Sequence, residues 1–342
     1  MDYLQITTKD NRYVYTTGRI RGLEKYLLKS ADFARIKETK DLRESFQNLH
    51  RFYPYSESMK VCTHPEDFEK GLEEEWKKTY LELISFVPEP DLVKLFWLEQ
   101  DFHNMKVLFK LHLQKKVPEE IDKVEHLSTS GTLNPDILSR AITKGDFFSL
   151  PSFFKDIINQ IMDTIEKGIS AKEIDVFLDK VYFQKFSLEL EKYKDDFLIE
   201  LGKKIIDSLN IKNFLRVKLW KREDEKKLLE DFIIDGGNIE KEIMIQLAGE
   251  PLDSLVGAIK RTEYVPVFQK ALEEWKQSRS LFSLDKSLEE IVLAFTHKGF
   301  YITFGREPLV NYILLKKKEI RDLRFILRAK KAGFLLGRQN EL

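Results

Sequence analysis

Apolar residues recur at helical spacing along almost the whole chain. Positions three and four residues apart lie on one face of an α-helix, so such a stripe marks the side of a helix that packs into a core. One clear stripe consists of Leu92, Leu95, Phe96, Phe102, Met105, Leu108 and Phe109. Only 15 glycines and 10 prolines interrupt the 342 residues. The sequence therefore predicts an all-α protein.

Five short stretches rich in proline, glycine and polar residues divide this helical pattern. They are YPYSES (53–58), VPEPD (87–91), STSGTLNPD (128–136), DGGN (235–238) and FGREP (304–308). Pro90 and Pro135 are each followed by an aspartate, and Pro308 stands at an expected first helical position. Proline is favoured in the first turn of a helix, so these stretches predict helix starts.

Glycine marks a pattern that occurs three times. A glycine followed by a basic or polar residue and then by isoleucine or leucine occurs at Gly18, Gly131 and Gly237. We expect each glycine to open a helix, and a small or acidic residue to introduce a second helix after it. The interval of roughly 110 residues indicates an internal repeat.

A second pattern, called the signature below, occurs at a similar interval. An acid at position i is followed by Asn or Asp at i+3 and by basic residues at i+5 and i+9. The three copies are Asp101, Asn104, Lys106 and Lys110; Asp207, Asn210, Lys212 and Arg216; and Glu319, Asp322, Arg324 and Arg328, with Lys330 just beyond. Together the two patterns predict three similar helical units, residues 1–115, 116–222 and 223–342, around a pseudo-threefold axis.

The signature also suggests an interface. On a helix, positions i and i+3 share one face, whereas i+5 and i+9 lie roughly on the opposite face. The acid and the bases of one copy therefore cannot meet. We hypothesise that the acidic face of one signature helix meets the basic face of the next copy or of a partner protein; ordinary solvated faces are the simpler alternative.

Charge and composition exclude several classes of protein. Lys and Arg together number 57, as do Asp and Glu, so no net field attracts nucleic acid or anionic lipid. This holds although LLKKKEIRDLRFILRAKKAG (314–333) carries eight basic residues. No run approaches the ~18 apolar residues of a membrane span. The single cysteine, Cys62, excludes an internal disulfide, and the first residues lack the pattern of an export signal, so we expect a cytoplasmic protein.

No motif of a known active site is convincing. GxGxxG, GxxxxGK[ST], HExxH and GxSxG are all missing, which speaks against a nucleotide site, a zinc protease and a serine hydrolase. The pair Asp195 and Asp196 could begin a DDxxD metal motif, but its fifth position is Ile199. We expect no catalytic residue, no cofactor and no metal.

The stretch GREPLVNYILLKKKEIRDLRFILRAKKAG (305–333) resembles the C-terminal region of the C subunit of archaeal and bacterial V-type rotary ATPases, which is equivalent to the d subunit of the vacuolar proton pump. The matching positions are Pro308, Leu309, Tyr312, Glu319, Ile320, Arg324 and Lys330. Shorter matches follow in the family's order at GRIRGLEKYLL with SADFARI, DFHNMK, IDSLNIKNFLRVK and DGGNI. The resemblance covers nearly the whole chain.

This resemblance implies a nearly all-helical, funnel-shaped body of three similar units. It further implies a non-catalytic central-stalk subunit, peripheral to the membrane, that couples the rotor stem to the membrane rotor ring for proton or sodium transport. One departure is Asp322, which stands where the first two copies carry Asn104 and Asn210, so strict threefold symmetry is not expected. A helical-repeat adaptor or scaffold unrelated to a rotary motor is the alternative, and a helical enzyme with a dispersed site is a third.

Overall fold

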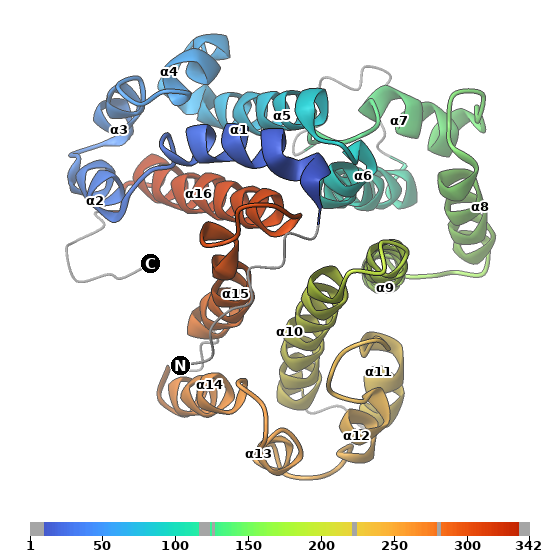
Figure 1. The fold of residues 1–342 in the computed structure, drawn as a ribbon. Coiled ribbons are helices and arrows are strands. Elements are labelled where there is room, and N and C mark those ends of the chain that lie inside the picture. The colour runs from blue at the N-terminus through green and yellow to red at the C-terminus, as the bar shows by residue number, and fades with distance from the viewer. Residues whose placement is uncertain (1–9, 116–123, 125–126, 221–223, 279–281, 335–342) are drawn as a thin grey trace. The chain divides into compact units, whose positions relative to one another are not determined.

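The computed structural model describes residues 10–115, 124, 127–220, 224–278 and 282–334, and these residues form helices and loops without a β-strand (Figure 1). The first ten α-helices are α1 (Val14–Glu24), α2 (Ser30–Glu38), α3 (Leu42–Leu49), α4 (Tyr55–Ser58), α5 (Phe68–Phe86), α6 (Pro90–Leu113), α7 (Pro135–Lys144), α8 (Ser152–Glu166), α9 (Ala171–Glu191) and α10 (Asp196–Trp220). They are followed by α11 (Glu225–Phe232), α12 (Lys241–Gln246), α13 (Ser254–Ala258), α14 (Val265–Ser278), α15 (Phe282–Thr296) and α16 (Glu307–Lys331). Short 3₁₀ turns occur at Asn11–Tyr13, Met59–Val61, Pro65–Asp67 and His297–Phe300. The predicted all-α class is confirmed.

The chain divides into two compact units. Unit 1 comprises the described residues within 1–107, 118–140 and 298–342, and unit 2 those within 108–117 and 141–297. The predicted boundaries of three units, at residues 115–116 and 222–223, fall on or beside segments outside the described residues.

In unit 1 the C-terminal helix lies among the N-terminal ones. Helix α16 packs against α1, α2, α3 and α5 (Figure 1). The core of this unit includes Trp76 of α5 stacked on Trp97 of α6, with ring centroids 4.0 Å apart. Large aromatic side chains bury much apolar area, so this pair contributes strongly to the stability of the unit.

In unit 2 the long helix α10 packs against α9, α11 and α15. Its buried side chains Ile211, Phe214 and Leu215 share an apolar core with residues of α11, α12, α14 and α15. Phe197 of α10 also stacks on Phe295 of α15, with centroids 5.3 Å apart. Helix α10 therefore lies at the centre of this unit, with buried residues on most of its circumference.

Local signals in the sequence explain where several helices begin. The side chain of Asp41 accepts a hydrogen bond from the backbone N–H of Glu44 (2.9 Å) and caps α3. Ser170 and Glu173 form a capping box at the start of α9. Helices α6, α7 and α16 have proline within their first two residues, as expected. The apolar stripe of Leu92 to Phe109 is buried throughout.

Two expectations about breaks need correction. Gly18 does not open a helix but lies inside α1, because the helix begins at Val14. The space around Gly18 is open, so no close contact requires a glycine at this position. The stretch 53–58 is not entirely a break, because its last four residues form α4. The remaining breaks separate helices as predicted, with Gly131 in the loop before α7 and Gly237 in the loop before α12.

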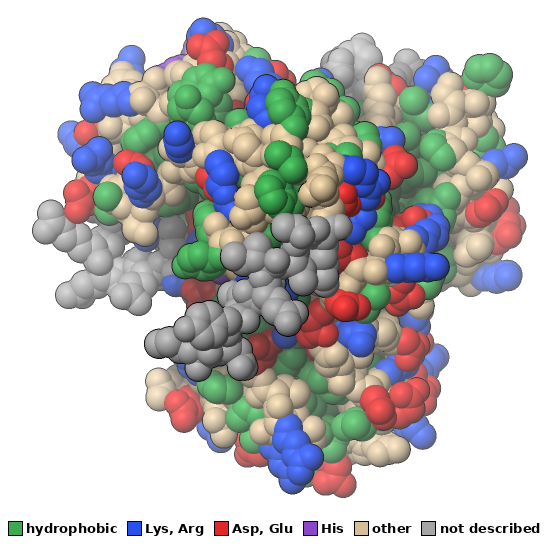
Figure 2. Space-filling model, viewed as in Figure 1, with side chains coloured by type: hydrophobic (Ala, Val, Ile, Leu, Met, Phe, Trp, Pro, Cys, Tyr) green, Lys and Arg blue, Asp and Glu red, His purple; other side chains and the backbone are tan. Residues whose placement is uncertain are grey.

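Acidic and basic side chains are interspersed over the face shown in Figure 2. In the described part of the chain, no helix combines the length and apolar character that crossing a bilayer requires.

Candidate functional site

The first signature joins α6 to the loop before α7. Both oxygens of Asp101 accept backbone N–H groups, from Thr132 (3.1 Å) and Leu133 (3.0 Å). One turn further along α6, the amide of Asn104 donates to the carbonyl of Ser128 and accepts from its N–H, both at 2.8 Å. Asp101 and Asn104 are fully buried. We call such a set of bonds a helix–loop contact.

The second signature makes a matching helix–loop contact in unit 2. Asp207 of α10 accepts the N–H of Ile239 (2.9 Å), and Asn210 exchanges two bonds with the backbone of Ile234 (2.7 and 2.9 Å). The separation from acid to loop is 32 residues in both copies, and from amide to loop 24 residues. The acid of this copy also accepts from the hydroxyl of Tyr264 (3.3 Å).

The repeated glycines lie inside these two contacts. A Cβ atom on Gly131 would collide with the carboxylate of Asp101, and a Cβ on Gly237 with that of Asp207. Glycine is therefore required here for close approach of the loop to the helix. The two sequence patterns meet in space, which explains why they recur at the same interval.

The third signature binds a loop at the other end of the chain. Glu319 of α16 accepts the backbone N–H of Leu28, in the loop between α1 and α2 (2.5 Å), and the hydroxyl of Tyr55 (2.6 Å). Asp322 does not repeat the amide exchange, because a carboxylate only accepts hydrogen bonds. It pairs instead with Lys318 (2.5 Å) and Arg321 (2.8 Å) of its own helix. The departure noted in the sequence thus changes the contact.

Lys316 forms a buried ionic cluster beside this third contact. Its amine binds Glu75 of α5 (2.8 Å) and Glu319 (2.7 Å), and the three side chains are 2–4% exposed. It also donates to the hydroxyl of Tyr55 at 3.4 Å. Burial lowers the pKa of Lys316, but the carboxylates of Glu319 and Glu75 more than offset this, so the pKa lies above its usual value and the amine stays charged.

The basic residues of the third signature bind two acids of α5 and a backbone carbonyl just after the end of α2. Arg324 pairs with Glu69 (2.9 Å) and Glu73 (3.1 Å), Arg328 pairs with Glu69 (2.6 Å), and the buried amine of Lys330 donates to the carbonyl of Thr39. Glu73 also accepts from the hydroxyl of Ser128, the residue held by Asn104. Within unit 1, Glu73 therefore links the third signature to the first contact.

In the other two copies, Lys110 binds Asp175 of α9 (2.7 Å) and Lys212 binds Asp285 of α15 (2.9 Å). Lys106 is half-buried, and Arg216 is exposed. These acidic partners lie outside the signatures, while the signature acids Asp101 and Asp207 accept hydrogen bonds from loops. This differs from the acid–base pairing between copies that the charge pattern suggested, because the buried carboxylates are satisfied by backbone N–H groups.

Burial changes the titration of the signature acids. It raises the pKa of Asp101 to about 6, although the hydrogen bonds from Thr132 and Leu133 act in the opposite direction. It also raises the pKa of Asp207, against bonds from Ile239 and Asn238. Each acid is thus held where its charge is costly, and its hydrogen bonds to the loop offset part of that cost.

The arrangement is suited to holding loops on helices, since the buried acids Asp101, Asp207 and Glu319 and the amides of Asn104 and Asn210 are bonded to the backbone of loops. Among the described residues, no group of three His, Cys, Asp or Glu side chains is placed to hold a metal ion. Sequence reasoning missed Tyr55, Tyr264, Glu75 and Lys316. The two tyrosines follow an arginine by a few residues in RFYPY and RTEY, a short signal that could have been found.

Comparison with known proteins gives a consistent result. A family model described as ATP synthase (C/AC39) subunit matches residues 16–335. The chain is 24% identical to the C subunit of the V-type sodium ATPase of Enterococcus hirae, over 94% of this chain and 95% of that protein. It is 26% identical to the C subunit of the A-type ATP synthase of Thermococcus onnurineus, covering 95% and 88%, and 22% identical to that of Methanocaldococcus jannaschii, covering 93% and 82%.

Proposed function

The chain belongs to the ATP synthase (C/AC39) subunit family, and we propose that it is the non-catalytic central-stalk subunit that couples the rotor stem of a V-type rotary ATPase to the membrane rotor ring. The observation that carries this proposal is the match of one family along residues 16–335, with relatives of nearly the same length that are named as the C subunits of V-type and A-type complexes. The transported ion would be a proton or sodium.

The internal contacts support a role in transmitting force. Torque must pass through a coupling subunit without separating its helices, so its loops and helices need to be held together. The helix–loop contacts of Asp101 and Asp207, and the buried cluster of Lys316, provide such connections. Buried, fully bonded polar groups specify one arrangement of a core, because any alternative leaves them unsatisfied.

We further propose that the body consists of three similar units, with the approximate bounds 1–115, 116–222 and 223–342, and that it has the funnel shape implied by the family resemblance. The equal separations of 24 and 32 residues in the first two helix–loop contacts support the repeat. Glu319 supports it too, because the loop that it binds at Leu28 precedes α2 as the loop at Leu133 precedes α7. In this view the third signature helix binds the loop of the first unit.

The partners in this proposal are the stem subunits and the rotor ring, and the chain is peripheral to the membrane in the cytoplasm. The signature residues remain candidates for an interface only where they reach the surface; Arg216 is exposed and Arg328 is 59% exposed in its side chain. The buried members Asp101, Asn104, Asp207, Asn210 and Glu319 would act by shaping the body.

Reconstitution tests the proposal. A complex that lacks this subunit should hydrolyse ATP without transporting ions, and adding the full chain should restore ion transport driven by ATP. The chain should also co-purify with stem subunits. A chain that neither binds the stem nor restores coupling would favour the helical adaptor unrelated to rotary motors.

A further inference from the structure

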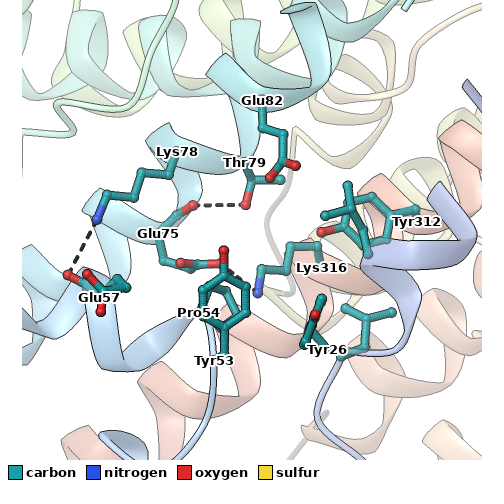
Figure 3. A pocket seen from close by; sticks show the side chains of 12 residues that line it. Tyr26, Tyr53, Pro54, Glu57, Glu75, Lys78, Thr79, Glu82, Tyr312 and Lys316 are labelled. Carbon is teal, nitrogen blue, oxygen red and sulfur yellow. Dashed lines mark hydrogen bonds and ion pairs between the residues drawn. The ribbon is translucent and has the colours of Figure 1, made fainter. Parts of the chain in front are cut away.

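Unit 1 contains a pocket of about 250 Å³ with walls from α1, α5 and α16 (Figure 3). Helix α16 supplies Tyr312 and Lys316, helix α5 supplies Lys78 and Glu82, and Tyr26 and Tyr53 come from loops. Sites for drug-sized ligands and cofactors usually measure about 300–1,000 Å³. The pocket is therefore of a size to take a single long side chain.

The hydroxyl of Tyr312 is the feature that points to a ligand. Tyr312 is 5% exposed, and in the part of the chain that the structure describes its hydroxyl has no hydrogen-bond partner. The side chain reaches into the pocket from α16, beside Lys316 (Figure 3). The hydroxyl is not among the buried side-chain atoms that lack a partner, so it opens onto the pocket and is available to water or to a molecule there.

The groups around Tyr312 select a cation over an anion. The three protons of the Lys316 amine are directed to Glu75, Glu319 and Tyr55, so this deep amine has none left for an anion. Lys78 lies nearer the surface, 44% exposed, and its amine is bonded to Glu74 and to the carbonyl of Glu57.

Carboxylates outnumber amines in the lining of the pocket: the carboxylates are those of Glu57, Glu75 and Glu82, and the amines are those of Lys78 and Lys316. Glu82 is 41% exposed and pairs with Arg19 at the surface. Exposed ion pairs of this kind contribute about 0–1 kcal/mol, so an incoming cation can share this carboxylate at little cost.

Aromatic rings complete the pocket. Tyr26 and Tyr53 are about half exposed and meet edge to face, with centroids 4.9 Å apart. A guanidinium group stacks favourably on tyrosine rings, and its planar donors suit a hydroxyl and a carboxylate together.

We propose that this pocket receives an arginine side chain of a partner protein, whose guanidinium stacks on Tyr26 or Tyr53 and donates hydrogen bonds to the hydroxyl of Tyr312 and to Glu82. The proposal rests on the proposed function only for the identity of the partner, which would be another subunit of the rotor. The pocket itself is a property of this chain and can be tested without the complex.

The test uses the full chain and Nα-acetyl-arginine amide, with binding followed by saturation-transfer NMR. The matched probe is Nα-acetyl-citrulline amide, which has nearly the same shape but no charge. We expect saturable binding of the arginine probe at millimolar concentration, and at least tenfold weaker binding of the citrulline probe. Equal binding of the two, or no saturable binding of the arginine probe, would overturn the proposal.

Tyr312→Phe separates recognition from folding. The hydroxyl has no hydrogen-bond partner among the described residues of the free chain, so its loss should leave the thermal unfolding midpoint unchanged. The same change should weaken the binding of the arginine probe at least fivefold. Tyr301→Phe removes a hydroxyl from a ring that is 72% exposed and does not line the pocket, and it should leave the binding of the arginine probe unchanged. If Tyr312→Phe binds the probe like the unchanged chain, the assignment is wrong. Such a failure leaves the coupling assay of the reconstituted complex untouched, so the two proposals can fail separately.

Discussion

Asn104 and Ser128 exchange two hydrogen bonds, with the side-chain amide of Asn104 bonded to both the N–H and the carbonyl of Ser128 at 2.8 Å. Both residues are buried, and the pair connects a long helix to a loop 24 residues away. The same pair of hydrogen bonds recurs between Asn210 and Ile234. A side-chain amide is suited to this place because it is both donor and acceptor, like the backbone group that it faces.

Replacing this amide should therefore be costly. We expect Asn104→Ala to lower the free energy of unfolding by about 2–3 kcal/mol, because a buried N–H and a buried carbonyl lose their partners. Urea unfolding followed by circular dichroism measures the loss. The control is Asn48→Ala on α3, where the amide bonds at the surface and the change should stay within about 0.5 kcal/mol. Equal effects of the two changes would contradict the role assigned to Asn104.

Glycine substitutions should have opposite signs at two positions of the repeat pattern. Gly131→Ala places a Cβ against the carboxylate of Asp101 and should destabilise the chain by about 1–3 kcal/mol, since the loop must move away from α6. Gly18→Ala adds a methyl group inside α1 with nothing within 4 Å and should stabilise it by about 0.5–1 kcal/mol. Unfolding midpoints of the two variants decide the matter; a shift in the same direction for both would show that the close approach at Gly131 is unimportant.

The sequence alone identifies the helix side chains of the helix–loop contacts, but not the loop groups that they bind. Asp101 and Asn104 stand three residues apart on a helix, as do Asp207 and Asn210, and glycine recurs at a matched interval, so these residues were identified as a set. Their partners were not identified because they are backbone N–H and carbonyl groups of Ser128, Leu133 and their counterparts, which any residue type would supply.

The buried cluster was harder to predict for a different reason. Lys316 is the first of three consecutive lysines, and nothing local distinguishes it from Lys317, whose side chain is 41% exposed. Which of them turns inward depends on Glu75, a residue of α5 far away in the sequence. The prediction that Gly18 opens a helix is wrong for a similar reason. Its position inside α1 depends on where the helix begins and not on the short pattern around the glycine.

Removing the buried amine of Lys316 should lower the free energy of unfolding more than removing the amine of Lys317. Lys316→Met leaves the carboxylates of Glu75 and Glu319 buried near each other without a cation, and we expect a loss of about 3–5 kcal/mol. Lys317→Met is the matched change at a half-exposed position and should cost about 1 kcal/mol or less.

Adding Glu75→Gln to Lys316→Met removes one of the two uncompensated charges and should recover part of the loss. The measurement is again the unfolding free energy of the single and double variants. Strictly additive losses would mean that the charges of Lys316 and Glu75 do not act on each other in the folded chain.

Asp101 should make stability depend on pH in an identifiable window. Its pKa of about 6 in the folded chain lies above the ordinary value of 3.8, so the folded state holds this proton more tightly than the unfolded state does. The stability that it contributes is fully present below about pH 4 and is lost as the pH rises through about 6. The difference amounts to about 2–3 kcal/mol between these limits.

Asp101→Asn isolates this contribution from the other carboxyl groups. The unchanged chain should lose more unfolding free energy than the variant when the pH is raised from about 4.5 to about 7, because the variant has no proton to release at this position. Asp91→Asn, at a side chain 83% exposed on the same helix, serves as the control and should keep the pH dependence of the unchanged chain. Parallel curves for the unchanged chain and Asp101→Asn would show that Asp101 titrates alike in the folded and unfolded states, and that its hydrogen bonds to the loop fully offset the cost of burying its charge.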